Sequence, residues 1–133
     1  MACERGTVLP AVLGVLLAGA LVLAVAVDLT RWASAHREAA SAAAAAAQAG
    51  AAMVSEPALR VGLLQVDPAR AITAASETGL AARPRDGRSV SATVADNEVC
   101  AVVNQPFRSS LLAALGSSEL VVRGTACAVP VRG

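Results

Sequence analysis

The residues of this chain that could carry chemistry are few and widely spaced. Three cysteines, Cys3, Cys100 and Cys127, and a single histidine, His36, stand in 133 residues. No CxxC pair is present, and one histidine with three dispersed cysteines has no spacing typical of a metal site. We therefore expect neither a metal ion nor a cofactor.

No arrangement of side chains indicates catalysis. His36 has no cysteine or serine beside it in a nucleophile motif. A phosphate-binding glycine loop and an HExxH motif are both absent. We expect a protein that is not an enzyme and has no small-molecule substrate. The carboxylates of the second half stand singly, at Asp67, Glu77, Asp86, Asp96, Glu98 and Glu119.

Charge is low and dispersed over the whole chain. There are 11 basic residues, all arginine, and 10 acidic ones, for a net charge of +1. Because both signs are scattered, the sequence predicts no basic face that would bind nucleic acid or anionic lipid.

The strongest signal for an element is an apolar run at residues 8–27, which follows an N-terminal tail at residues 1–7. The run has no charge, amide or hydroxyl, and about 20 helical residues cover the roughly 30 Å of bilayer hydrocarbon. Gly14 and Ala18 have the spacing that lets a partner helix approach closely. The run predicts a transmembrane helix.

A cleaved secretory signal is the main alternative to that anchor. Ala33-Ser34-Ala35 offers a small-residue cleavage site before His36. The apolar run is longer than the about 7 to 15 residues usual in a signal, and the polar stretch 28–32 separates it from that site. We favour an uncleaved single-span anchor over this alternative and over a buried helix of a soluble protein.

Residues 28–54 are expected to continue the same helix as an alanine-rich extension to about Met53. Their small residues form a stripe that suits packing on the domain expected at residues 55–133, called the tail domain below, or on a sister helix. The alternative is a low-complexity alanine tract. Asp28 closes the apolar run next to Trp32, where it can pair with Arg31 or simply mark the membrane boundary.

Residues 55–133 predict a small αβ domain. Pro57 ends the long helix, and a short helix is expected from Asp67 as N-cap to a stop at Gly79. Strands are expected at residues 89–94, 98–103 and 120–129, with Pro106 and a short helix near residues 111–115 separating the last two. The fold class is α+β, with a long N-terminal transmembrane helix that continues as an exposed helix, then a short helix and about three antiparallel strands.

A sheet of that size is marginal alone and would gain from a covalent link. Cys100 and Cys127 fall in two of the expected strands and can form a disulfide if these strands are neighbours. Closing a loop of about 27 residues would stabilise the fold by roughly 3 to 4 kcal/mol. The alternative is two small buried side chains that never pair. Cys3 is expected to be a free thiol, with acylation as the alternative.

Three features follow one another in the first part of the chain. An arginine and a glycine precede the span, an acidic residue with a basic and an aromatic residue closes it, and an alanine-rich helix comes after. They are Arg5-Gly6, then Asp28-Leu-Thr-Arg31-Trp32, then Ala35-His-Arg37 and the alanines up to Gln48-Ala-Gly. This order, over residues 4–52, resembles the TadE/TadG-like proteins of tight-adherence (Flp, type IVb) pilus assembly. The resemblance implies a membrane-anchored minor pilin or pseudopilin-like component with a cytoplasmic N-terminus and an exported C-terminal domain, assembling with other pilin-like proteins.

The sequence departs from that pattern at one position. Pilin-like members processed by the prepilin peptidase carry a glutamate five residues after the cleavage-site glycine, and counting from Gly6 this position is Ala11. The departure favours an uncleaved anchor. Arginines lie on both sides of the span, so the positive-inside rule does not favour the N-terminus-inside orientation. The exported tail is expected from the resemblance and from the two tail cysteines.

Three functions are consistent with these patterns. The first is a single-pass component of pilus assembly or of a related secretion system, acting by helix packing and protein contacts. The second is a small secreted binding module released after Ala35. The third is an unrelated small scaffold protein of the cell envelope.

Overall fold

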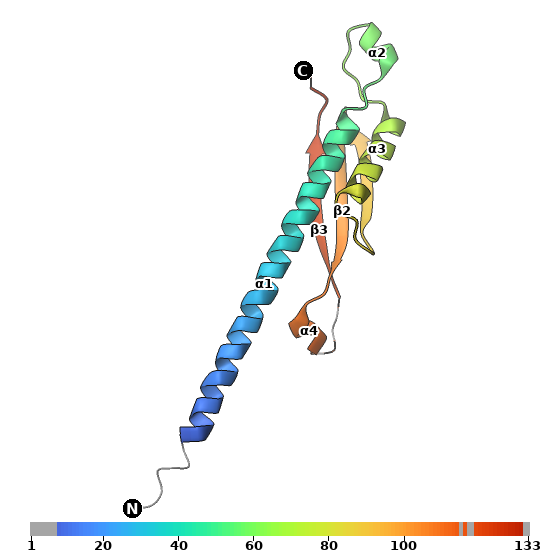
Figure 1. Cartoon of the computed structure of the whole chain (residues 1–133). Coiled ribbons are helices and arrows are strands. Elements are labelled where there is room, and N and C mark those ends of the chain that lie inside the picture. The colour runs from blue at the N-terminus through green and yellow to red at the C-terminus, as the bar shows by residue number, and fades with distance from the viewer. Residues whose placement is uncertain (1–7, 115, 117–118, 132–133) are drawn as a thin grey trace, which may run out of the picture.

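A helix of 44 residues is the axis of the fold. The computed structural model describes residues 8–114, 116 and 119–131, so predictions that concern residues 1–7, Cys3 and Arg5-Gly6 among them, lie outside the described residues. The expected α+β layout is confirmed (Figure 1). The elements are α1 (Val8–Ala51), α2 (Glu56–Arg60), α3 (Pro68–Ala81), β1 (Ser89–Ala95), β2 (Glu98–Phe107), α4 (Ser110–Ala114) and β3 (Leu120–Ala128).

The two halves of α1 have different surroundings. In Figure 1 the first half stands clear of the rest of the chain, and the second half lies along the sheet. Residues 9–27 are exposed except for the partly covered Ala24. Within the described residues, α1 is the helix long and apolar enough to cross a membrane. It ends at Ala51, slightly before the expected Met53, and the chain then turns away.

The three strands form one antiparallel sheet in the order β1-β2-β3. A tight turn at Asp96 and Asn97, both with positive φ (49° and 66°), joins β1 to β2, and such a two-residue turn matches the twist of a hairpin. Side chains of β2 alternate, with Val99, Ala101 and Val103 fully buried against helices. On the opposite face of the sheet the side chains of β1 and β3 are exposed.

The buried face of the sheet packs on α1 and α3, and the contact is made mainly of small residues. A stripe of alanines on α1 is buried, and each contributes only one methyl group, so the backbones come close together. Gly124 of β3 lies so near α1 that a Cβ there would collide with the backbone of Ala39 and Ala40. The alanine stripe consists of Ala35, Ala39, Ala42, Ala43, Ala46, Ala47 and Ala51.

Two details of the sequence prediction were wrong. The expected stop at Gly79 lies inside α3, which runs on to Ala81. Gly79 is used for close packing, because a Cβ there would lie 2.9 Å from Cγ1 of Val90. Pro106 does not separate β2 from the next element but belongs to β2 itself. β1 reaches no further than the partner of Asn104, so β2 has a free edge at Pro106, where a strand tolerates proline.

The far end of the fold holds an element that the sequence analysis missed. The chain leaves α1, forms the short helix α2 and returns through a bridge between Val54 and Val66. The β1–β2 turn holds the segment around α2 in place, because Asn97 accepts from the Val66 N–H (2.7 Å) and donates to the Leu64 carbonyl (2.9 Å). The expected N-cap of α3 is confirmed: Asp67 accepts from the Arg70 N–H at 3.3 Å.

Candidate functional site

The contact between Asp28 and α4 fixes the end of the tail domain that faces the apolar half of α1. Asp28 is 8% exposed. Its carboxylate accepts from the Ser109 hydroxyl (2.7 Å), the Leu111 N–H (3.0 Å) and the Ser110 N–H (3.3 Å). The residue that closes the apolar run is therefore also the acceptor for the first backbone N–H groups of α4.

Hydrogen bonds explain the ionisation of this carboxyl. The Leu111 N–H and the Ser109 hydroxyl, which donate to the carboxylate, hold the pKa of Asp28 below its ordinary value, against the opposing effect of burial. The positive charge of Arg31 acts in the same direction. Asp28 is thus anionic at neutral pH.

The sequence left open whether Asp28 pairs with Arg31 or marks the membrane boundary; in the structure both side chains contact the start of α4. Within the described chain the ion pairs involve Glu38, not Asp28. Arg31 instead donates from Nη1 to the Ser110 hydroxyl at 3.2 Å. Both residues therefore hold α4.

Within the part of the chain that the structure describes, Trp32 contacts His36 and not α4. It is 47% exposed, and its ring lies 5.8 Å from the ring of His36, which is exposed on the next turn. Gly14 and Ala18 lie on the exposed half of α1, residues 9–27, called its bare half below. A Cβ added at Gly14 would meet nothing within 4 Å. This surface is free for another helix or for lipid.

A buried polar network ties the middle of α1 to the sheet, and the sequence analysis did not predict it. Glu38 receives two hydrogen bonds from Arg85 (3.1 and 2.8 Å) and one from Arg88 (2.8 Å). Arg88 also donates to Gln105 Oε1 at 2.7 Å and to the Ala82 carbonyl. Gln105 in turn donates to the Ala35 carbonyl at 2.9 Å.

The network fixes register more than it offers a reactive group. The Arg88 side chain is 1% exposed, and Gln105 is fully buried. Its signal in the sequence is the alternation of β2: Gln105 shares the parity of Val99, Ala101 and Val103, so it must face the core and needs a partner there. The partner of Gln105 could not be identified from the sequence, because Arg85 and Arg88 lie in a segment interpreted only as a turn.

A cleft of about 940 Å³ opens at the end of the tail domain that holds Asp28 and α4. Three arginines line it, Arg31 from α1, Arg85 from the 82–88 turn and Arg108 after β2. Asp86 and Glu119 also line it. Arg108 is exposed and lies next to Ser109, which bonds to Asp28.

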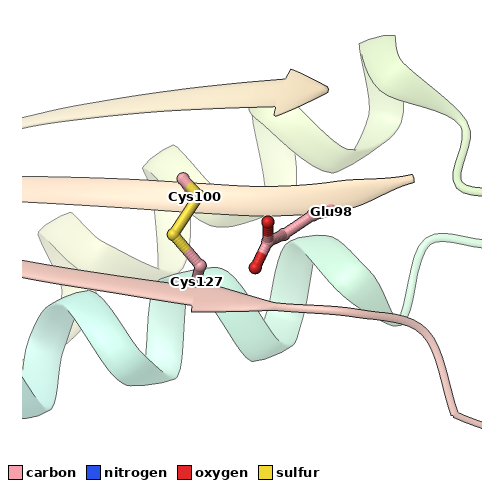
Figure 2. A group of neighbouring side chains, drawn as sticks. All are labelled: Glu98, Cys100 and Cys127. Atoms are coloured by element: carbon pink, nitrogen blue, oxygen red, sulfur yellow. A yellow bond between two sulfur atoms is a disulfide. The ribbon is translucent and has the colours of Figure 1, made fainter. Parts of the chain in front are cut away.

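Cys100 and Cys127 are joined by a disulfide, the bridge expected from the sequence. They face each other directly in the pairing of β2 with β3. Figure 2 shows the carboxylate of Glu98 beside the two sulfurs. The three side chains come close enough to suggest a metal site. With the sulfurs bonded to each other neither is a thiolate, so the group offers one carboxylate and does not fit a metal ion.

Comparisons of the chain with family models, with curated proteins and with solved structures found no match.

Proposed function

We propose that this chain is a single-pass membrane-anchored component, minor pilin or pseudopilin-like, of type IVb pilus assembly or of a related secretion system. It acts by helix packing in the membrane and by protein contacts outside it, and it carries out no reaction. The proposal combines the resemblance over residues 4–52 with the layout of α1.

One observation carries the proposal: α1 is a single helix with two uses. Its exposed half, residues 9–27, matches a bilayer in length and composition. Its second half supplies the alanine stripe on which the sheet and α3 pack. Because no loop separates the halves, the tail domain is rigidly coupled to whatever the membrane half contacts. A helix that assembles laterally in the membrane would thereby position its own tail.

Contacts around Ala35, the cleavage site of the alternative signal peptide, favour the anchor over a secreted module. Cleavage after Ala35 would remove Asp28 and the Ala35 carbonyl, which accept hydrogen bonds from Ser109 and Gln105. It would also remove Ala35 from a buried cluster with Ala39 and Phe107. The released domain would lose part of its own core.

The intact mass of the cell-associated protein tests the anchor. We expect a membrane-fraction species that retains residues 8–27. Recovery of a species beginning at His36 would overturn the anchor and support the secreted module.

Orientation has a separate test, thiol labelling of whole cells after mild reduction. We expect Cys100 and Cys127 to react with an impermeant maleimide in intact cells. Reaction only after permeabilisation would place the tail domain in the cytoplasm and exclude the exported form.

Neighbouring genes distinguish pilus assembly from an unrelated envelope scaffold. A pilus-assembly component should be encoded beside a secretion ATPase and multi-span platform proteins. Their absence from the surrounding genes, in a chain that is anchored, would favour the scaffold.

A further inference from the structure

Hydrogen bonds to Asp28 set the position of α4 along the axis of α1. Asp28 accepts from Ser109, Ser110 and Leu111, so α4 begins beside the last turn of the apolar half. Figure 1 shows α4 as the tail element closest to the N-terminal end of α1. Ala24, one turn before Asp28, is the partly covered residue among exposed neighbours. The start of α4 therefore lies level with the end of the apolar half of α1.

Around α4 the side chains change from uncharged to basic over a short distance. The helix α4 reads Ser-Leu-Leu-Ala-Ala, without a charge, and Ala113 and Ala114 are exposed. Arginines border it on the tail side, with Arg31 bonded to Ser110 and Arg108 exposed at the cleft. An uncharged tip with guanidinium groups behind it matches the change from acyl chains to phosphates in a lipid leaflet.

Given the thickness of a bilayer, α4 and the neighbouring Arg31 fall in its headgroup layer. Residues 8–27 fill the hydrocarbon, and the polar layer adds about 5 to 7 Å on each side. Arg31 lies about 4.5 Å beyond Asp28 along the helix axis, within that layer. A helix as short as α4 cannot lie deeper, because its unpaired backbone groups need water. Asp28 satisfies two of those N–H groups.

From these observations we infer that α4 is a second, shallow membrane contact. It lies in the headgroup layer of the leaflet from which α1 emerges, with Arg31 and Arg108 beside lipid phosphates. The inference rests on the proposed function, because it requires residues 8–27 to span the bilayer. Its partner is the lipid itself, since the surface is continuous with the span. The contact would fix how far the tail domain stands above the membrane.

Depth-dependent fluorescence quenching tests the inference on the full chain. In a Cys3→Ser background with the disulfide intact, an NBD fluorophore is attached through Ala114→Cys. Leu17→Cys in the middle of the span and Ala69→Cys, exposed on α3, are the matched controls. Each protein is reconstituted in vesicles of phosphatidylcholine and phosphatidylglycerol brominated either near the headgroup or near the chain ends.

We expect the label at position 114 to be quenched several-fold more by bromine near the headgroup than the label at position 69. The label at position 17 should respond to bromine near the chain ends. If position 17 is quenched but position 114 behaves like position 69, the α4 contact is wrong and the anchor stands. A blue-shifted but unquenched label at position 114 would mean cover by protein and would also overturn the contact. No quenching at position 17 would overturn both proposals.

Discussion

Asp28 couples the ionisation of one carboxyl to the position of α4. Hydrogen bonds from the Leu111 N–H and the Ser109 hydroxyl stabilise its anionic form and lower its pKa. A group whose pKa is depressed by folding stabilises the fold above its unfolded pKa, and this contribution is lost as pH falls through the folded value. Asp28 should therefore hold α4 at neutral pH and release it in acid, below about pH 4.

The change Asp28→Asn tests this coupling. It should speed amide hydrogen exchange of Ser110 and Leu111 at neutral pH, because a neutral amide accepts more weakly from their N–H groups. The acid-dependent loosening below about pH 4 should also disappear in the variant. The control is Asp86→Asn, which leaves the contact to α4 intact. Unchanged protection in Asp28→Asn would contradict the role of the carboxylate.

Gly124 is the residue where an added methyl group should cost the most. A Cβ would collide with the backbone of Ala39 and Ala40, which cannot move aside as a flexible side chain can. We expect Gly124→Ala to lower the free energy of unfolding of the tail domain by at least about 1 to 3 kcal/mol, the range for overpacked cores. Pulse proteolysis in urea measures it, with Gly19→Ala on the bare half of α1 as control. Equal stability of the two variants would show that α1 and β3 are less closely packed.

At the scale of elements, the network around Glu38 joins α1 to β2 and to the 82–88 turn. Glu38→Gln leaves Arg88, 1% exposed, without its anionic partner. Breaking a buried pair from one side costs about 3 to 5 kcal/mol, and we expect a loss of tail-domain stability in that range. The matched control is Arg85→Gln, because Arg85 is 49% exposed and an exposed pair contributes about 0 to 1 kcal/mol. Similar losses for both variants would mean that Arg88 does not depend on Glu38.

The disulfide joins β2 to β3 in a domain whose core is poor in large side chains. Replacing Cys100 and Cys127 together by serine should destabilise the tail domain by roughly 3 to 4 kcal/mol, as expected for the loss of a closed loop of this length. Urea-dependent proteolysis with and without reductant measures the loss. Reductant should destabilise the parent chain and have no further effect on the double variant. A parent chain indifferent to reductant would contradict the contribution of the bridge.

The elements that the sequence predicted well are those with a strong local signal. The apolar run, the alanine helix, Asp67 with Pro68, and the alternation of β1 each carry their period or cap in adjacent residues. The predictions failed where a distant partner decides. Gly79 is a packing residue rather than a helix stop because Val90 lies against it. Pro106 fits β2 only because β1 ends before it.

The same reasoning explains why parts of the candidate site were missed. Asp28 could be seen as the boundary of the apolar run, but its acceptor role depends on residues about eighty positions away, Ser109 to Leu111. Glu38 stood among polar residues of a helix face and gave no sign of Arg88. Contacts of such sequence separation cannot be predicted from local periodicity.

At the scale of the whole molecule, the core of the tail domain belongs jointly to α1 and to the rest of the chain. Ala46 and Ala47 pack with Ala75 and Ala101, and Ala42 and Ala43 pack with Val103. Each buried cluster contains at least one residue of α1. Residues 55–133 therefore lack one layer of their own core, although the sequence alone delimits them as a domain.

Two truncations test this shared core. A fragment of residues 28–133 keeps Asp28 and the alanine stripe while losing the bare apolar half, so it should fold and give a dispersed amide NMR spectrum. A fragment of residues 55–133 keeps the disulfide but exposes the buried face of β2, so it should not fold cooperatively. Adding residues 28–54 as a separate peptide should restore dispersion, because the α1 layer is what the shorter fragment lacks. A fragment of residues 55–133 that folds alone would show that the tail domain does not need the α1 layer for its core.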